Sequence, residues 1–446
     1  MTRLDRRESQ GIFVRIEGID PNEYIIVHYR VVVSNGSTIE ECAARLATLT
    51  SLGTMSKLPY EDTAKRISVG AKVLRADESG EVVIAFPLEL CSPNEGLTQL
   101  LTIVFYGASF NYTRELWVEN IDIPKAFARN FKGPRLGIAG VREKFGIHAR
   151  PPLGVIMKPR LGVSLAGIAE NCSEALLGGA DFVVDDELLL DREGELAFEN
   201  RVSKMVGIVE NAEKATGERK WYTANIAASP LRSMRYARIA HESGASGVLV
   251  NAFTMGFSTV DELVNQIEEY GMVVVVHNMG VGILTRPLIS ESFKRPTGVS
   301  DALIAKLSRM VGGDAVHGGI SHSEWYHKEA WGSPIVALRS GFHEFKPSFA
   351  VAAGGLTVEN AWENIASLGP DVILEAGNGI LGYPSGPRHG AEGLRKLIKE
   401  LSPDLSSHEA QEKIAELGDK DKWLQDGLRY YGYGRRRNRE GSDRPC

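Results

Sequence analysis

Six short segments of this 446-residue sequence place residues that can do chemistry directly after an apolar run of strand length. They are Lys158-Pro159-Arg160, Asp185-Asp186-Glu187, His277-Asn278, His317-Gly318-Gly319, Gly354-Gly355 and Gly377-Asn378-Gly379. Each alone has an ordinary explanation, because a glycine after a strand often makes a turn and a lone histidine is more often structural than catalytic. Six together predict one shared site.

The residue types predict a cation, a phosphate and a proton-transfer group. Successive carboxylates repel one another unless a cation neutralises them, so Asp186 and Glu187, with Asp185 as a third candidate, are predicted Mg2+ ligands. Glycines after the last two runs expose backbone N–H groups, where a phosphate typically binds in a barrel. Lys158, partly desolvated and near a cation, can act as an acid or base. A salt-bridged acidic cluster and plain turn geometry are the alternatives.

Eight apolar runs, each followed by a helical pattern, must position these residues. The runs are GVIMKPR, ADFVVDD, WYTANIA, SGVLVNAF, MVVVVHNMG, DAVHGGI, PSFAVAAGG and DVILEAGNG. Eight strand–helix units in about 250 residues predict an α/β fold with a (β/α)8 TIM barrel, whose strand ends meet at one mouth. An open, doubly wound sheet is the competing architecture, but the sequence lacks a nucleotide fingerprint.

A smaller α+β domain of split-βαβ, ferredoxin-like type is predicted ahead of the barrel. Residues 24–33, 71–76 and 81–90 read as strands, and residues 38–48 and 97–104 as helices. The predicted organisation is an N-terminal domain in residues 1–135 and the catalytic barrel in residues 136–403. Residues 404–446 are predicted to be a helical stretch followed by a disordered end.

The composition excludes several classes of protein. A net charge of −6 does not favour nucleic acid or an anionic membrane as a partner. The longest apolar runs are far shorter than the roughly 20 residues that cross a bilayer, and the N-terminus lacks the apolar core of a secretory signal. The four cysteines are widely spaced, which argues against a zinc site or a disulfide framework. These features predict a cytoplasmic protein.

The segments resemble motifs of the RuBisCO large-subunit superfamily. MKPRLGVS (157–164) resembles IKPKLGLS, and GGADFVVDDE (178–187) resembles GGLDFTKDDE. VHGGI (316–320), VAAGGL (351–356) and AGNGILGYP (376–384) are similar to IHSGT, VASGGI and FGGGTLGHP. The resemblance spans the barrel and extends more weakly to SLGT (51–54) and IDIP (121–124) in the N-terminal domain. It implies the RuBisCO large-subunit architecture.

The resemblance also implies roles for individual residues. It makes Lys158 the acid or base around an enediolate, and His277 and His317 active-site histidines. Asp186 and Glu187 match the carboxylate ligands of the catalytic Mg2+. The implied phosphate or substrate contacts are Arg160, Asn278, Gly354, Gly355, Gly377, Asn378 and Thr54. Thr54 matches a residue that the neighbouring subunit supplies, which implies a homodimer or a higher assembly of dimers.

Departures from the family pattern are equally informative. Val184 stands where RuBisCO carbamylates a lysine to complete its metal site, and valine can form no carbamate. Asn278 and Ala353 replace an arginine and a serine that hold a second phosphate. A glutamate and an asparagine of the family are missing near Leu49 and Tyr106. Counting along the segment that matches the family's mobile loop aligns Glu324 with the lysine that stabilises CO2 in RuBisCO. Lys328 lies four residues further along the sequence.

These departures predict a RuBisCO-like protein of the form IV branch that does not fix CO2. The leading hypothesis is an enzyme that forms or uses a Mg2+-stabilised enolate of a phosphorylated oxo-sugar acid or ketose phosphate. Val184 favours a decarboxylase or transcarboxylase-hydrolase of carbohydrate acid catabolism, because carbon–carbon cleavage does not begin with the carbamate as base. The alternatives are an enolase or isomerase of methionine salvage, which acts on a methylthio-sugar phosphate, and a non-catalytic scaffold. An unrelated phosphate-binding barrel such as an aldolase is disfavoured by the length of the motifs.

Overall fold

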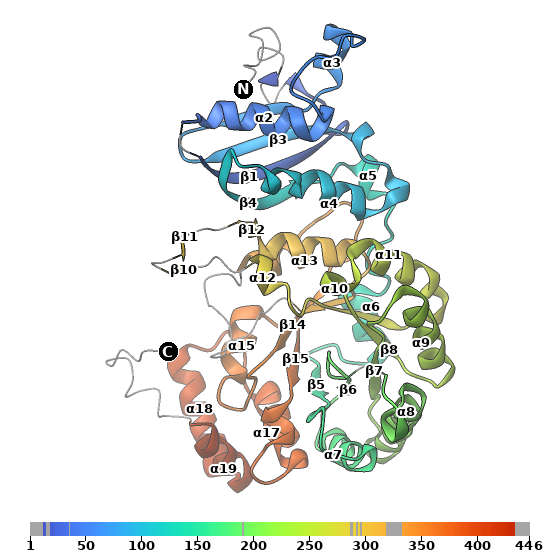
Figure 1. Ribbon diagram of the computed structural model, residues 1–446. Helices are drawn as coiled ribbons and strands as arrows, with labels where there is room; N and C mark the ends of the chain where they lie inside the picture. The colour runs from blue at the N-terminus through green and yellow to red at the C-terminus, as the bar shows by residue number, and fades with distance from the viewer. Residues whose placement is uncertain are drawn as a thin grey trace.

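A closed barrel of eight parallel strands forms the larger part of the protein (Figure 1). The computed structural model describes residues 12–14, 18–34, 36–189, 191–285, 289–290, 293–294, 297–317 and 332–432. Around the barrel the strands are β5 (Leu153–Ile156), β6 (Phe182–Val184), β7 (Trp221–Asn225), β8 (Gly247–Asn251), β9 (Val273–His277), β13 (Ala315–His317), β14 (Phe349–Ala353) and β15 (Val372–Ala376). β15 pairs with β5 and closes the ring, which confirms the predicted barrel.

A helix follows each barrel strand and covers its outer face. These helices are α7 (Leu165–Leu177), α8 (Phe198–Thr216), α9 (Pro230–Glu242), α11 (Phe257–Gln266), α13 (Asp301–Met310), α14 (Gly332–Arg339), α15 (Ala361–Leu368) and α17 (Pro387–Glu400). Three short helices, α10 (Ala252–Met255), α12 (Gly282–Thr285) and α16 (Asn378–Leu381), lie in loops after strands. At the C-terminal end of the described chain, α18 (Ser407–Asp419) and α19 (Lys422–Tyr431) pack beside α17 (Figure 1).

Helix α6 (Gly137–Phe145) plugs the N-terminal end of the barrel with apolar side chains. The ring of Phe145 stacks on Trp221 of β7 with 3.9 Å between ring centroids, and Trp221 stacks in turn on Phe182 of β6 at 4.4 Å. The buried carboxylate of Asp314 accepts hydrogen bonds from the backbone N–H groups of Leu136 and Gly137 at the start of α6. With this end filled, the opposite mouth is the place for chemistry.

The N-terminal domain is a five-stranded sheet with helices on it. Its strands are β1 (Tyr24–Val33), β2 (Lys72–Ala76), β3 (Glu81–Pro87) and β4 (Thr113–Asp122), and its helices are α2 (Ile39–Leu52), α3 (Thr63–Val69), α4 (Leu97–Tyr106) and α5 (Lys125–Ala128). The fifth strand, β12 (Gly298–Val299), comes from the barrel part of the sequence and pairs in parallel with β4. Residues Ile289–Ser290 and Phe293–Lys294 form the small hairpin β10–β11.

The side of this domain that carries α4, β4 and β12 faces barrel helices α11 and α13 (Figure 1). Thr98 of α4 donates to Ser258 of α11 through its hydroxyl at 2.8 Å, and Lys306 of α13 donates to the backbone oxygen of Ile121 at 2.6 Å. These bonds fix the two domains against each other. Among the helices of the described ranges, we find none that is both long and apolar enough to cross a membrane.

Candidate active site

Strand alternation selects the side chains that face the inside of the barrel at its mouth. Val184, Val275, Ala315 and Ile373 belong to the apolar cluster inside the barrel. Side chains two residues apart on a strand point to the same face. Asp186, His277, His317 and Glu375 therefore follow these apolar residues on the inner face, one step closer to the mouth.

Two carboxylates and two cations form a closed cluster at the ends of β5 and β6. Lys158 pairs with Asp186, and its ammonium nitrogen lies 3.9 Å from an oxygen of Glu187. Arg160 donates through Nε to Asp186 at 2.6 Å and through a terminal nitrogen to Glu187 at 3.0 Å. The hydrogen bond to buried Asp186 raises the pKa of Arg160 above its usual range, against a lowering by burial. The structure thus brings together Lys158, Asp186 and Glu187, with Arg160 on the carboxylates.

Asp185 does not join this cluster, which corrects its prediction as a third metal ligand. Its fully enclosed carboxylate lies 3.2 Å from the guanidinium of Arg201 on α8. It also accepts from the hydroxyl of Tyr222 at 2.7 Å and from the backbone N–H of Asn225 at 2.9 Å. Burial raises the pKa of Asp185, and Arg201 opposes that rise. Asp185 points outward between strand and helix because Val184 and Asp186, its neighbours, point inward.

Val184 is 1% exposed and belongs to the barrel interior, at the position that the sequence resemblance matches to a carbamylated lysine. Among the residues whose positions are described, no three of histidine, cysteine, aspartate or glutamate form a metal-binding group. Asp186 and Glu187 are nevertheless hard oxygen donors that converge on one place, as Mg2+ requires. This donor set fits the ion when other ligands come from substrate or water.

His277 and His317 face each other at the mouth. Their rings stack with centroids 4.3 Å apart and an angle of 26° between the planes. Nδ1 of His277 accepts a hydrogen bond from the backbone N–H of Met279 at 2.9 Å, so Nε2 carries the proton of the neutral ring. Burial first, then the charges of His317 and Lys158, hold the pKa of His277 well below its usual value. His277 is therefore a neutral hydrogen-bond donor at neutral pH.

Asn278 connects the end of β13 with helix α13. Its amide nitrogen donates to the hydroxyl of Ser308 at 3.1 Å and to the backbone oxygen of His317 at 3.2 Å. The residue is 7% exposed. Among the described residues its side-chain oxygen has no hydrogen-bond partner, and its contact with substrate stays a prediction.

The two glycine turns after β14 and β15 lie against each other beside Lys158. Gly354 and Gly355 have left-handed backbones, with φ of 82° and 75°. A methyl group built on Gly379 would lie 2.0 Å from the backbone oxygen of Leu356, so only glycine permits this contact. One built on Gly377 would lie 3.4 Å from Cγ of Lys158. The predicted phosphate glycines and the predicted acid–base lysine therefore share one mouth.

Asn378 begins helix α16 and is held by the C-terminal helix. The hydroxyl of Tyr431 on α19 donates to the backbone oxygen of Asn378 at 2.8 Å. The predicted phosphate loop is thus braced from outside the barrel, a contact that the sequence did not reveal.

Thr54 lies in the N-terminal domain, in a loop that Arg66 holds. The guanidinium of Arg66 donates to the backbone oxygen of Thr54 at 2.5 Å and to both oxygens of Glu61. The contacts recorded for Thr54 within this single chain stay in its own domain, with Ser56 and Arg66. Its predicted place in the mouth would need a second chain.

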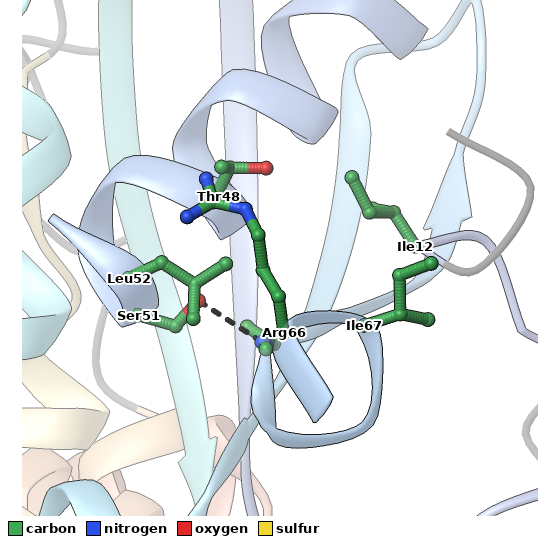
Figure 2. A pocket seen from close by; sticks show the side chains of 8 residues that line it. Ile12, Thr48, Ser51, Leu52, Arg66 and Ile67 are labelled. Carbon is green, nitrogen blue, oxygen red and sulfur yellow. Dashed lines mark hydrogen bonds between the residues drawn. The ribbon is translucent and has the colours of Figure 1, made fainter. Parts of the chain in front are cut away.

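Two cavities lie elsewhere in the molecule. The first, about 20 Å³, lies beside α2 and is lined by Thr48, Ser51 and Arg66 among others (Figure 2). The Ser51 hydroxyl accepts a hydrogen bond there from the backbone N–H of Ala71. This cavity has room for about one water molecule. The second, about 280 Å³, is lined by residues 132–135 and by Met272 and Val274 near the beginning of β9, at the far end of the barrel from the mouth. Neither contains a predicted site residue.

Glu375 is the functional candidate that sequence reasoning missed. It is 1% exposed, and one carboxylate oxygen lies 3.1 Å from Nε2 of His317. Its signal in the sequence is a lone acidic residue in an apolar strand, two positions before Gly377. The predicted loop residues Gly318, Gly319, Glu324 and Lys328 lie outside the described residues.

Comparisons with known proteins agree with this geometry. Residues 14–127 match the N-terminal domain of the ribulose bisphosphate carboxylase large chain, and residues 137–418 match its catalytic domain. The ribulose bisphosphate carboxylase of Methanocaldococcus jannaschii is 31% identical over 426 residues, with 89% of this chain and 98% of the relative covered. That of Archaeoglobus fulgidus is 29% identical, with 88% and 92% covered.

Solved structures of RuBisCO from other organisms superpose on almost all of the chain. Octameric RuBisCO from Pyrococcus horikoshii matches with a TM-score of 0.84 and 29% identity, covering 96% of this chain and 97% of that one. Dimeric RuBisCO from Hyperthermus butylicus matches with a TM-score of 0.79 and 28% identity, covering 96% and 100%. With both domains matched along their length, the chain belongs to the ribulose bisphosphate carboxylase large-chain family.

Proposed function

We propose that this chain is a non-carboxylating, RuBisCO-like member of its family that forms or uses the enolate of a phosphorylated oxo-sugar acid. The observation that carries the proposal is that the mouth of the barrel lacks one functional group of the carboxylases but retains three others. Val184 places an apolar side chain where carboxylases of the family build a metal-binding carbamate, whereas Lys158, Asp186 and Glu187 stay together. The cluster can still stabilise negative charge, but it lacks the lysine carbamate that activates the carboxylases of the family for CO2 fixation.

The reaction that suits these residues is decarboxylation. The bond between the carboxyl group and the adjacent carbon breaks, CO2 leaves, and the bonding electron pair becomes the enolate of the neighbouring ketone. Lys158 and Arg160 would hold positive charge beside that enolate, where a water-poor site strengthens the attraction. His277, neutral and protonated on Nε2, would donate a hydrogen bond to the enolate oxygen. A proton delivered to the carbon then completes the product.

Mg2+ belongs to this proposal with a reduced ligand set. Asp186 and Glu187 would hold the ion, with the remaining ligands from substrate oxygens or water. When bound, it would supply Lewis-acid stabilisation of developing negative charge. Arg160 now lies on both carboxylates, so it competes for the place of the ion.

A substrate with one phosphate fits the mouth. The adjoining glycine turns around Gly355 and Gly377 offer backbone N–H groups to one phosphate. Asn278, at the position of the second phosphate anchor, uses its amide on Ser308 and His317. Ala353, at the position of that site's serine, has no hydroxyl to offer. The far end of the substrate is therefore not a second phosphate.

A homodimer is the smallest assembly that would complete this site. The solved relatives are described as dimeric and octameric. Thr54 would come to the mouth from the partner chain, on the loop that Arg66 and Glu61 hold. Light scattering of the purified protein should give twice the 48.7 kDa of one chain or a multiple of that dimer.

The test is CO2 release from a 3-oxo-sugar-acid phosphate by purified protein with Mg2+. We expect release by the unaltered protein, and loss of at least about 100-fold in Lys158→Ala, the usual cost of removing one group that stabilises developing negative charge. Arg75→Met is the control, because Arg75 pairs with two partly exposed carboxylates in the other domain. Absence of CO2 release across a panel of such acids would count against decarboxylation.

A further inference from the structure

Glu375 places a carboxylate inside the barrel, directly below the mouth. It lies on β15 opposite Ala353 of β14, two residues beyond the interior Ile373. Its side chain is 2% exposed. An isolated buried carboxylate is costly unless a partner neutralises or hydrogen-bonds it. The partner that the structure provides is His317.

The two facing atoms of this pair are both unsatisfied. Nε2 of His317 and an oxygen of Glu375 are 3.1 Å apart, within ion-pair reach but without the alignment of a hydrogen bond. Within the described part of the chain, neither atom has a hydrogen-bond partner. Buried polar atoms without partners are rare and call for a functional or structural reason. A small rotation of either side chain would place one proton between them and satisfy both.

The pair connects with the substrate side through the second imidazole. His317 stacks on His277 from β9, and Lys158, which follows β5, acts on His277 through its charge. Glu375 is the carboxylate that faces His317 from β15. Because Nε2 of His317 points to Glu375, Nδ1 is the ring nitrogen left for proton transfer at the mouth. Asn278 fixes the backbone of His317 in this arrangement.

We propose that Glu375 is a positioning residue that fixes His317 as the Nε2–H tautomer, making the pair the acid–base unit of the site. The inference rests on the proposed enolate chemistry. The protonated ring gives its Nδ1 proton to the enolate carbon after CO2 leaves and becomes neutral, because Nε2 keeps its own proton and donates it in a hydrogen bond to Glu375. Solvent then reloads Nδ1. A buried carboxylate that orients a catalytic imidazole in this way strongly affects turnover and little affects binding.

This arrangement places the anionic group two strands away along the barrel wall, with β5 between the two positions. The family's carbamate would extend from β6, where Val184 is apolar in this chain. Glu375 supplies a carboxylate from β15 instead, and it acts through an imidazole.

The experiment is nitrogen NMR of the imidazoles in the full-length protein, with turnover measured in parallel. The protein carries ten histidines, and His317→Gln identifies the signal of interest. In the unaltered protein we expect a single Nε2–H tautomer of His317 at neutral pH. In Glu375→Gln, whose amide can also donate to Nε2, we expect that signature to be lost. kcat should fall at least about 100-fold while KM stays within about threefold.

Asp314→Asn is the matched control, because it alters another buried carboxylate at the opposite end of the barrel. It should leave the His317 signals in place. A dominant Nδ1–H tautomer of His317 in the unaltered protein would overturn the inference, even if Glu375→Gln did not fold. An unchanged signature and unchanged kcat in Glu375→Gln would overturn it as well. If the signature changes but no oxo-sugar acid is turned over by any form, the proposed function fails and the pairing stands.

Discussion

Arg160 occupies the place where Mg2+ would meet Asp186 and Glu187, so its removal should strengthen binding of the ion. Its guanidinium donates to Asp186 at 2.6 Å and to Glu187 at 3.0 Å. Asp186 is fully buried and the Glu187 side chain is 10% exposed. In Arg160→Met, Lys158 alone would neutralise two carboxylates.

The structure sets the size of this effect. A hydrogen bond to a charged group contributes about 1.5–3 kcal/mol when buried, but the Arg160 side chain is 38% exposed, and solvent screening reduces each of the two bonds to about 0.5–1 kcal/mol. The total, about 1–2 kcal/mol, is lost from the free energy of unfolding without Mg2+. Mg2+ binding to the variant no longer requires displacement of the guanidinium. The same free energy therefore makes the Mg2+ dissociation constant of the variant about 5- to 30-fold lower than that of the unaltered protein.

Isothermal titration with MgCl2 measures the affinity, and urea unfolding with and without Mg2+ measures the stability. Arg75→Met is the matched control, since Arg75 also binds two carboxylates, Asp77 and Glu81, but is 56% exposed in the N-terminal domain. It should leave Mg2+ affinity unchanged. An equal or weaker affinity in Arg160→Met would refute the competition between Arg160 and the ion.

Three further outcomes follow from contacts around the site. Arg201→Met leaves Asp185 as an uncompensated buried charge, so urea unfolding should show a loss of about 3–5 kcal/mol; a loss below about 1 kcal/mol would contradict the pairing. Gly377→Ala should fold normally, because the added methyl meets Lys158 at an ordinary 3.4 Å, yet weaken inorganic phosphate binding at least about tenfold by titration; unchanged binding would remove Gly377 from the phosphate site. Burial raises the pKa of Asp314 to about 6 from 3.8. The native state therefore keeps a proton that the unfolded state loses, and stability falls by about 3 kcal/mol as pH rises from about 4 to 6. Asp314→Asn should lack that part of the slope in urea unfolding, and an identical slope would contradict the shift.

The convergence of Lys158, Asp186, Glu187 and Gly377 was predictable from the sequence. In a parallel barrel all strand ends meet at one mouth, so eight repeated units were enough to place these residues together. Side chains alternate between the inner and outer faces of a barrel strand. This alternation would also have placed Asp185 and Asp186 on opposite faces, and Glu375 on the inner face with Ile373. The sequence contained that information, although the prediction did not use it.

Other features depend on contacts that no local pattern carries. Strand β12 has two residues, too few for any periodicity, and it pairs with β4 because the barrel loop passes the N-terminal sheet. The partners of Arg160 and Asn278 follow from side-chain geometry within the mouth. The predicted role of Thr54 requires a second chain, so the structure of one chain does not test it.

Incorporation of labelled CO2 with ribulose 1,5-bisphosphate and Mg2+ tests the absence of carboxylation most directly. With Val184 in place of a carbamate-forming lysine, we expect acid-stable label no higher than in a heat-inactivated sample. Incorporation well above that background by the unaltered protein would show that carboxylation survives without the carbamate and would contradict the proposed function.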